Sequence, residues 1–163
     1  MNTTESKDGQ HSTGTPIKLI NNKQMRLLIA DDSKLLRKKL RDELENLGCE
    51  VFEASNGKEA ITFDLEHEPD GIILDIVMPE VGGIEALSTI REVSPDVPVV
   101  MLSSAGTPQK LMQTLKMGAI DFIQKPYTHE QIVKAVETIR RIRIKNLQKA
   151  AEEAALGEGG EEQ

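Results

Sequence analysis

The stretch GIILDIVMPEVGG, residues 71–83, indicates the fold of this 163-residue chain. The apolar run 71–74 ends on one carboxylate, Asp75, and then breaks into Met78-Pro79 and Gly82-Gly83. A short apolar run bounded by turn residues is typical of a strand that is buried on both faces of a parallel sheet. An aspartate at the end of such a strand is often only a turn residue. Its role here therefore depends on what the other strand ends carry.

The rest of the chain repeats this alternation of strand and helix. The expected strands are residues 26–30, 49–54, 71–74, 99–102 and 121–124. The expected helices are one that carries Leu36, Leu40, Leu44 and Leu47 and stops at Gly48, followed by residues 55–68, 82–93, 107–117 and 128–144. Five strand–helix pairs predict an α/β fold, a doubly wound, five-stranded parallel sheet of the flavodoxin-like (βα)5 type with strand order 2-1-3-4-5.

The chain is expected to form one domain with two tails. Residues 1–22 are polar and lack apolar periodicity, so we expect a disordered N-terminal arm. Residues 23–143 form the expected domain, and residues 144–163 a helical extension with an acidic tail. For this extension a solvated helix is the main interpretation, and a contact with a partner or with a second copy in a homodimer is the alternative.

Composition argues against several classes of protein. No apolar stretch is long enough to insert into a membrane, and the polar N-terminus lacks the apolar core of a secretory signal. The single cysteine, Cys49, cannot form an internal disulfide and lies in a strand pattern, so we expect it to be buried and the protein to be cytoplasmic. A formal net charge of −7 and an aromatic content of 2% argue against binding to nucleic acid.

Polar residues gather where the expected strands end. In a parallel sheet all carboxyl ends lie on one edge, where ligands bind, and here they carry Asp31-Asp32, Asp75, Ser103-Ser104 and Lys125-Pro126. Taken alone, Asp31, Asp32 or Ser33 could simply cap the first helix. Three carboxylates on one edge repel one another unless a cation neutralises them, and such oxygen ligands suit Mg²⁺ or Mn²⁺. With Lys125 as a second positive charge, the cluster predicts phosphoryl transfer onto a carboxylate.

Four pieces of sequence carry a resemblance to a known family. They are LLIADDS (27–33), GIILDIVMPEVGGIEAL (71–87), VVMLSSAG (99–106) and GAIDFIQKPY (118–127). Together they resemble the receiver domain of two-component response regulators, the CheY-like superfamily, over about residues 25–143, and are most similar to stand-alone chemotaxis-type regulators. The resemblance implies a phosphoacceptor signalling protein of a two-component phosphorelay, such as chemotaxis, and not an enzyme.

The resemblance also implies how the acidic residues act. Asp75 is the expected phosphoacceptor. Asp32 and Asp75 would ligate Mg²⁺ together with the backbone carbonyl of Val77, and Asp31 would hold a metal-bound water. Mn²⁺ could take the same place.

The remaining implied roles concern the phosphoryl group and the switch. Ser103 would hydrogen-bond the phosphoryl group, Lys125 would pair with it, and Phe122 would act with Ser103 as the switch aromatic. The family usually has a cis peptide where Lys125-Pro126 stands. The side chains that flank the approach of water, Val77 and Ala105, cannot hydrogen-bond a water, so slow hydrolysis is expected and a separate phosphatase would end the signal.

The implied partners are proteins. A histidine kinase would donate the phosphoryl group, and a downstream target would bind the surface formed by the helix at 107–117, the strand at 121–124 and the helix at 128–144. In this family the first helix often meets the kinase, but its basic side chains are interpreted here as a solvated face. They are Lys34, Arg37, Lys38, Lys39 and Arg41.

Three other functions are disfavoured by particular residues. A haloacid-dehalogenase-type phosphatase would need a second aspartate where Val77 stands. A flavodoxin-like flavin carrier would need a Ser/Thr/Gly loop for phosphate after the first strand, where Asp31-Asp32 stand instead. A degenerate receiver that acts only as a scaffold is disfavoured because Asp32, Asp75, Ser103 and Lys125 are all present.

Overall fold

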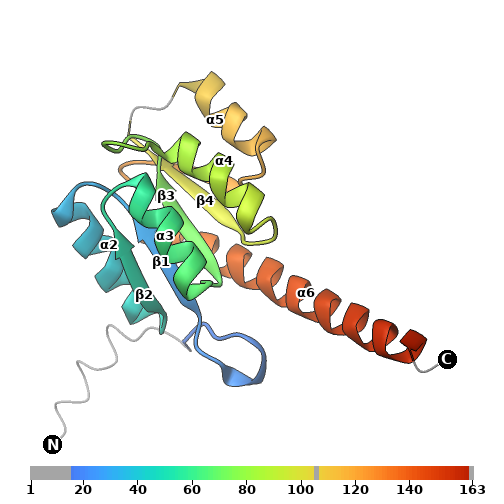
Figure 1. Cartoon of the computed structure of the whole chain (residues 1–163). Helices are drawn as coiled ribbons and strands as arrows, with labels where there is room; N and C mark the ends of the chain where they lie inside the picture. Colours follow the sequence, from blue (N-terminus) through green and yellow to red (C-terminus); the bar gives the residue numbers. More distant parts are fainter. Residues whose placement is uncertain (1–15, 105–106, 162–163) are drawn as a thin grey trace, which may run out of the picture.

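The computed structural model describes residues 16–104 and 107–161. Figure 1 shows a central sheet flanked by helices, with one long helix that leaves the domain. The strands are β1 (Arg26–Ala30), β2 (Glu50–Ala54), β3 (Gly71–Asp75), β4 (Val99–Ser103) and β5 (Asp121–Gln124). The helices are the short 3-10 helix η1 (Ile20–Asn22) and α2 (Lys34–Asn46), α3 (Gly57–His67), α4 (Gly83–Val93), α5 (Pro108–Lys116) and α6 (His129–Glu161).

The five strands form one parallel sheet in the order β2-β1-β3-β4-β5, which confirms the predicted fold class and strand order. β3 lies in the middle, and all of its residues are buried, as its continuous apolar run predicts. Ala30 of β1 lies opposite Leu74, and Asp75 of β3 lies opposite Leu102. The register therefore brings the carboxyl ends of β1, β3 and β4 to the same edge of the sheet.

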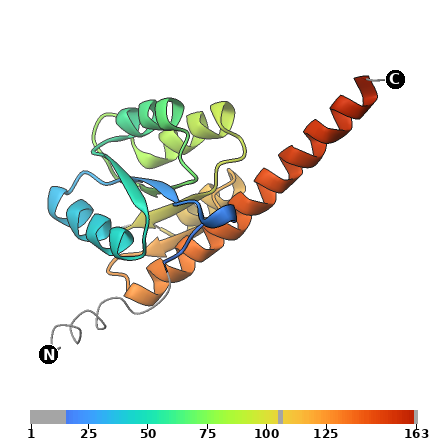
Figure 2. The same ribbon diagram turned by 90° about the horizontal axis from the view of Figure 1, so that it is seen from below.

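Helices cover both faces of this sheet (Figure 2). Successive side chains of a strand point to opposite faces, so Leu27 and Ile29 join one core cluster while Leu28 and Ala30 join the other. The first cluster takes its helical residues from α2 and α6, namely Leu40, Leu44, Ile132, Ala135, Val136 and Ile139. The second takes them from α3, α4 and α5, namely Ala60, Ala86, Leu87, Ile90 and Leu111. The sheet is thus the middle layer of three.

The glycine pair at the end of the stretch 71–83 allows α4 to begin close to β3. A Cβ atom on Gly83 would lie 2.0 Å from the backbone oxygen of Asp75, so no larger residue fits there without a shift of the backbone. The amide of Gly83 donates a hydrogen bond of 2.8 Å to the carbonyl of Ile76. Gly82 forms the N-cap of α4. The turn is therefore packed directly against the end of the strand that carries Asp75.

Residues 16–22, which were expected to belong to a disordered arm, are packed against the domain, so this part of the prediction is wrong. Ile17 and Leu19 are only 8% and 6% exposed and lie in the first core cluster. The amide of Ile17 donates to the carbonyl of Leu47 at 2.9 Å, and Lys18 forms an isolated bridge with Gln24. Two apolar side chains separated by one residue suffice to anchor so short a segment, but they are too few to produce a periodic pattern. Residues 1–15 of the expected arm lie outside the described residues.

Helix α6 begins as predicted but continues to Glu161, well past the domain (Figure 2). Its first half buries Ile132, Val136 and Ile139. Arg143 then forms an ion pair with the buried Asp70 at 3.0 Å. Beyond this anchor, the described side chains from residue 148 to residue 157 are exposed. Helix α6 therefore covers most of residues 144–163, and it includes Gly157.

No helix in the described part of the chain combines the length and the apolar character that a membrane crossing requires.

We expect Leu19→Ala to lower the free energy of unfolding by about 2–3 kcal/mol, because the substitution leaves a cavity beside α2 and α6. Leu35→Ala is the matched control: Leu35 is 77% exposed, and its truncation should change the free energy of unfolding by about 0.5 kcal/mol or less. Urea unfolding of the full chain measures both. Equal effects of the two substitutions would show that residues 16–22 are not part of the core.

Candidate functional site

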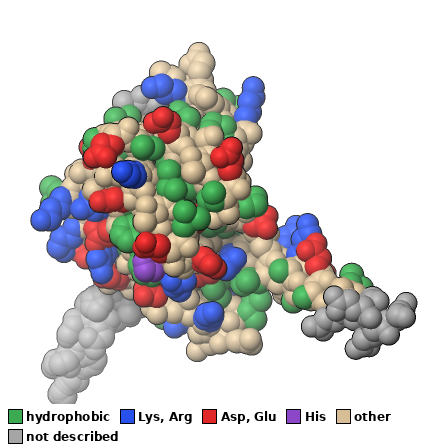
Figure 3. Space-filling model, in the orientation of Figure 1, with side chains coloured by type: hydrophobic (Ala, Val, Ile, Leu, Met, Phe, Trp, Pro, Cys, Tyr) green, Lys and Arg blue, Asp and Glu red, His purple; other side chains and the backbone are tan. Residues whose placement is uncertain are grey.

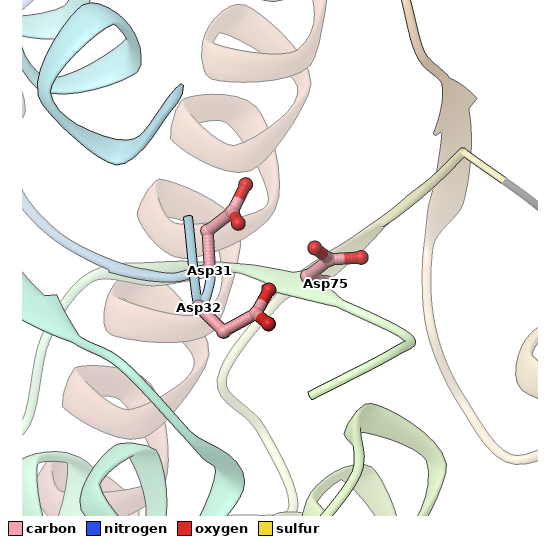
Figure 4. A group of neighbouring side chains, drawn as sticks. All are labelled: Asp31, Asp32 and Asp75. Carbon is pink, nitrogen blue, oxygen red and sulfur yellow. The ribbon is translucent and has the colours of Figure 1, made fainter. Parts of the chain in front are cut away.

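Three aspartates meet at the carboxyl edge of the sheet (Figure 4). Asp31 and Asp32 follow β1 in the loop to α2, and Asp75 is the last residue of β3. One carboxylate oxygen from each of the three lies within 4.8 Å of the other two. Asp31 and Asp75 are buried, whereas Asp32 is exposed. The sequence-predicted acidic residues are therefore brought together, with one of them open to solvent.

Asp31 is held by hydrogen bonds on each side. Its amide donates to the carbonyl of Ala54 at 3.1 Å, and its Oδ1 accepts from the amide of Ser33 at 2.9 Å. The residue that caps α2 is Ser33, whose Oγ accepts from the amide of Leu36 at 3.2 Å. The capping alternative therefore applies to Ser33, while the carboxylate of Asp31 turns toward the cluster.

Lys125 bridges the two buried aspartates. Its Nζ donates to Asp31 Oδ2 at 2.8 Å and to Asp75 Oδ2 at 2.9 Å. Its amide donates to the carbonyl of Ser103 at 2.8 Å, which connects the strand ends of β4 and β5. Burial favours the neutral amine, but the hydrogen bonds and charges of Asp31 and Asp75 outweigh it and raise the pKa of Lys125. The expected cis peptide between Lys125 and Pro126 is present.

The environment of Asp75 disfavours the charged form of its carboxyl group. Burial raises the pKa of Asp75 above its ordinary value. The ammonium of Lys125 and the amide of Val77 lower it again, and the negative charge of Asp31 raises it, so the net direction is upward. A further positive charge at this point would relieve the strain between the carboxylates.

The donor set fits a divalent cation. Hard cations such as Mg²⁺ take carboxylate oxygens together with waters and phosphate oxygens. Asp31, Asp32 and Asp75 supply such oxygens at mutual distances of 4.8 Å or less, and the exposure of Asp32 leaves one side open to water or to phosphoryl oxygens. The cluster could therefore hold a metal ion. A ligand role for the Val77 carbonyl remains a prediction.

The other predicted site residues surround this cluster. Ser103 is the last residue of β4 and is buried. Phe122, on β5, is half-buried against the core on the α3–α4–α5 side. Val77 follows Asp75 closely and is 57% exposed, so an apolar side chain stands beside the acidic cluster. Ala105 lies outside the described residues.

One residue near the site differs from its interpretation. Lys and Arg side chains gather over α2 in the space-filling view (Figure 3), and Arg37 was assigned to this solvated basic face, but its side chain is only 14% exposed. Its Nη1 donates to the backbone carbonyl of Asp31 at 2.6 Å, and its Nε donates to Glu53 Oε1 at 2.7 Å. The sequence offered one indication of this role, because Arg37 lies in the first turn of a helix that follows an acidic loop. The contact with Glu53 could not be predicted, because it depends on the position of β2.

Comparisons with known proteins agree with this geometry. The model of the response regulator receiver domain family matches residues 27–137. The chemotaxis protein CheY of Thermotoga maritima is 36% identical over 117 residues, which cover 71% of this chain and 98% of that protein. The chemotaxis protein CheY of Bacillus subtilis is 37% identical over 112 residues, which cover 68% of this chain and 93% of that protein.

A solved structure is similar in both sequence and shape. It is the crystal structure of the CheX–CheY–BeF3–Mg²⁺ complex from Borrelia burgdorferi, with a TM-score of 0.68 and 31% sequence identity, and the match covers 79% of this chain and 92% of that chain. The match of the family model over most of the domain and the CheY relatives together show that this chain belongs to the response regulator receiver domain family.

Proposed function

We propose that this protein is a single-domain response regulator that accepts a phosphoryl group from a histidine kinase on Asp75. The observation that carries the proposal is the bridge from Lys125 to Asp31 and Asp75 within a cluster of three carboxylates. Receiver domains are signalling phosphoacceptors rather than enzymes in the usual sense. The two CheY relatives are matched over nearly their whole length, which supports a role in a chemotaxis-type or related cytoplasmic pathway.

In the proposed reaction, a carboxylate oxygen of Asp75 attacks the phosphorus of a phosphohistidine. The O–P bond to Asp75 forms as the P–N bond breaks, and the imidazole that leaves takes up a proton. Lys125, already beside Asp75, would pair with the transferred group, and Ser103 would hydrogen-bond it. Asp31, Asp32 and Asp75 would hold Mg²⁺, or Mn²⁺ in its place. When bound, such an ion neutralises charge on the carboxylates and on the phosphoryl oxygens.

The proposed output is a change in a protein-binding surface. Ser103 ends β4, Phe122 lies on the neighbouring strand β5, and α5 and α6 flank that strand. If Ser103 turns toward the phosphoryl group, Phe122 can move inward, and the surface of α5, β5 and α6 changes for a downstream protein. A ligand shifts such an equilibrium only through contacts that differ between the two states, and the Ser103 contact is the proposed difference.

We also propose that the aspartyl phosphate hydrolyses slowly. Hydrolysis needs a water aligned behind the phosphorus, and alignment is a large part of such barriers. Val77 is exposed beside Asp75 and offers no group that could hold this water. A phosphatase that brings its own polar group would then end the signal.

Incubation with acetyl phosphate and Mg²⁺ tests the acceptor. Intact-mass measurement should show one added phosphoryl group on the wild type and none on Asp75→Asn, because an amide oxygen is a poor nucleophile. The exposed Asp121 supplies the control, and Asp121→Asn should be labelled like the wild type. Chelation of the metal should stop the reaction. Undiminished labelling of Asp75→Asn would contradict the assignment.

Without metal, Asp75→Asn should unfold at a higher temperature than the wild type at pH 7. The pKa of Asp75 is raised in the folded state, so ionisation of this group costs stability once the pH exceeds the ordinary aspartate pKa of about 3.8. The advantage of the variant should therefore shrink as the pH falls toward that value. Mg²⁺ at a hundredfold excess over its Kd should stabilise the wild type by about 2.7 kcal/mol and the variant by less. Calorimetry with and without Mg²⁺ measures both, and equal Mg²⁺ effects would contradict a metal ligand role for Asp75.

Ser103→Ala should separate phosphorylation from switching. Asp75 should still be labelled, but amide chemical shifts of residues 107–135 should respond to beryllofluoride and Mg²⁺ less than those of the wild type. Ser104→Ala is the matched control, because the neighbouring Ser104 is exposed and should leave the response intact. A full wild-type response in Ser103→Ala would show that another group couples the site to the surface.

A further inference from the structure

The contacts of Arg37 join two parts of the molecule that the proposed reaction requires to be fixed. Its guanidinium donates from Nη1 to the carbonyl oxygen of Asp31 at 2.6 Å and from Nε to Glu53 Oε1 at 2.7 Å. Arg37 lies in the first turn of α2, and Glu53 lies on β2, the strand at the edge of the sheet next to β1. The side chain therefore ties the loop after β1 to the neighbouring strand.

The position of the accepting carbonyl makes this contact important for the acidic cluster. The carbonyl of Asp31 belongs to the peptide group that joins Asp31 to Asp32, and the two Cα atoms of these residues lie in one rigid plane with it. A hydrogen bond that fixes this plane therefore fixes the origin of both carboxylates. The amide of Asp31 is already held by Ala54 of β2 at 3.1 Å, so β2 controls the loop on both sides of Asp31.

The cluster needs such a tether because its charges oppose assembly. Three carboxylates with oxygens within 4.8 Å repel one another, and the loop that carries two of them would relieve the repulsion by moving outward. Lys125 holds Asp31 and Asp75 through their side chains, and neither of these two hydrogen bonds involves Asp32. Arg37 acts from the opposite side and through the backbone, so its effect extends to Asp32.

We propose that Arg37 is a positioning residue for the metal-binding aspartates, held in place by Glu53. Its guanidinium orients the Asp31–Asp32 peptide so that both carboxylates face the same cation. This inference rests on the proposed function, because it assigns the cluster to Mg²⁺. Outer groups that orient metal ligands usually change metal affinity by about 10–100-fold when they are removed.

Arg41 provides a matched control one helical turn further along α2. It also forms an ion pair with Glu53, from Nη1 to Oε2, and a second ion pair with Glu45 at 2.9 Å. Its hydrogen bonds to Glu45 and Glu53 do not involve the loop at 31–33. Removal of Arg41 therefore costs the same glutamate one partner but leaves the carbonyl of Asp31 bound to Arg37.

The test measures Mg²⁺ binding to the full chain from amide chemical shifts, without any phosphodonor. Arg37→Met should raise the Kd for Mg²⁺ about tenfold, whereas Arg41→Met should change it by about twofold or less. Arg37→Lys should fall between the wild type and Arg37→Met, because an ammonium keeps the charge but cannot form the forked pair of hydrogen bonds. Where Arg37→Met fails to fold, Glu53→Gln and Arg37→Lys carry the same test in the same direction.

A second measurement separates positioning from simple loss of stability. The rate of labelling by acetyl phosphate should fall about tenfold in Arg37→Met at low Mg²⁺ and return to within about twofold of the wild type at saturating Mg²⁺. An unchanged Kd in Arg37→Met, or equal Kd values in Arg37→Met and Arg41→Met, would overturn the inference. A wild type that binds no Mg²⁺ would instead overturn the proposed metal site, and this inference with it.

Discussion

The ammonium group of Lys125 lies between the carboxylates of Asp31 and Asp75, at 2.8 Å and 2.9 Å, and all three side chains are largely removed from water. Buried charges are tolerated when they are paired, and here one ammonium group pairs with two carboxylates at once. The pairing is incomplete, however, because Asp32 adds a third carboxylate to the same cluster. The site therefore has more negative than positive charge. A bound cation would reduce this excess, and a phosphoryl group bound together with its metal would also alter the net charge of the site.

The sheet can hold these charges close together because its strands are rigid and in register. β1 and β3 are neighbours, which places the ends that carry Asp31 and Asp75 side by side. β5 is two strands away from β3, and the long side chain of Lys125 reaches back across β4. Gly83 allows α4 to begin directly against the backbone of Asp75, where a Cβ atom would not fit. The backbone positions that hold the charged groups are thus set by the packing of the two core clusters on the sheet.

The two sides of the site differ in how they are held. On the β1–β2 side the loop of Asp31 is bound through its amide, its carbonyl and both oxygens of its side chain, to Ala54, Arg37, Ser33 and Lys125. On the β4–β5 side Ser103 is buried and its carbonyl accepts a hydrogen bond from the amide of Lys125, while Phe122 packs half-buried against the second core cluster. The β1–β2 side thus carries two of the proposed metal ligands, and the β4–β5 side carries the proposed switch residues. The proposed positioning role of Arg37 concerns the β1–β2 side, and the proposed switch through Ser103 concerns the β4–β5 side.

Local patterns in the sequence were enough to predict the strands, the helices and the residues at the strand ends, because apolar periodicity and turn residues act over a few positions. The alternation of strand and helix then predicted the strand order, and with it the meeting of Asp31, Asp32, Asp75 and Lys125. Contacts between distant segments could not be predicted in this way. Ile17 and Leu19 are too few to form a pattern, and they are buried only because α2 and α6 leave an apolar surface beside them. The sequence pattern of α2 predicted a solvated side chain for Arg37, but in the folded chain β2 places Glu53 Oε1 2.7 Å from its Nε. Sequence patterns thus predicted which side chains reach the edge of the sheet. The neighbours that hold these side chains became known only from the fold, because they come from strands and helices whose separation in space is unrelated to their separation along the chain.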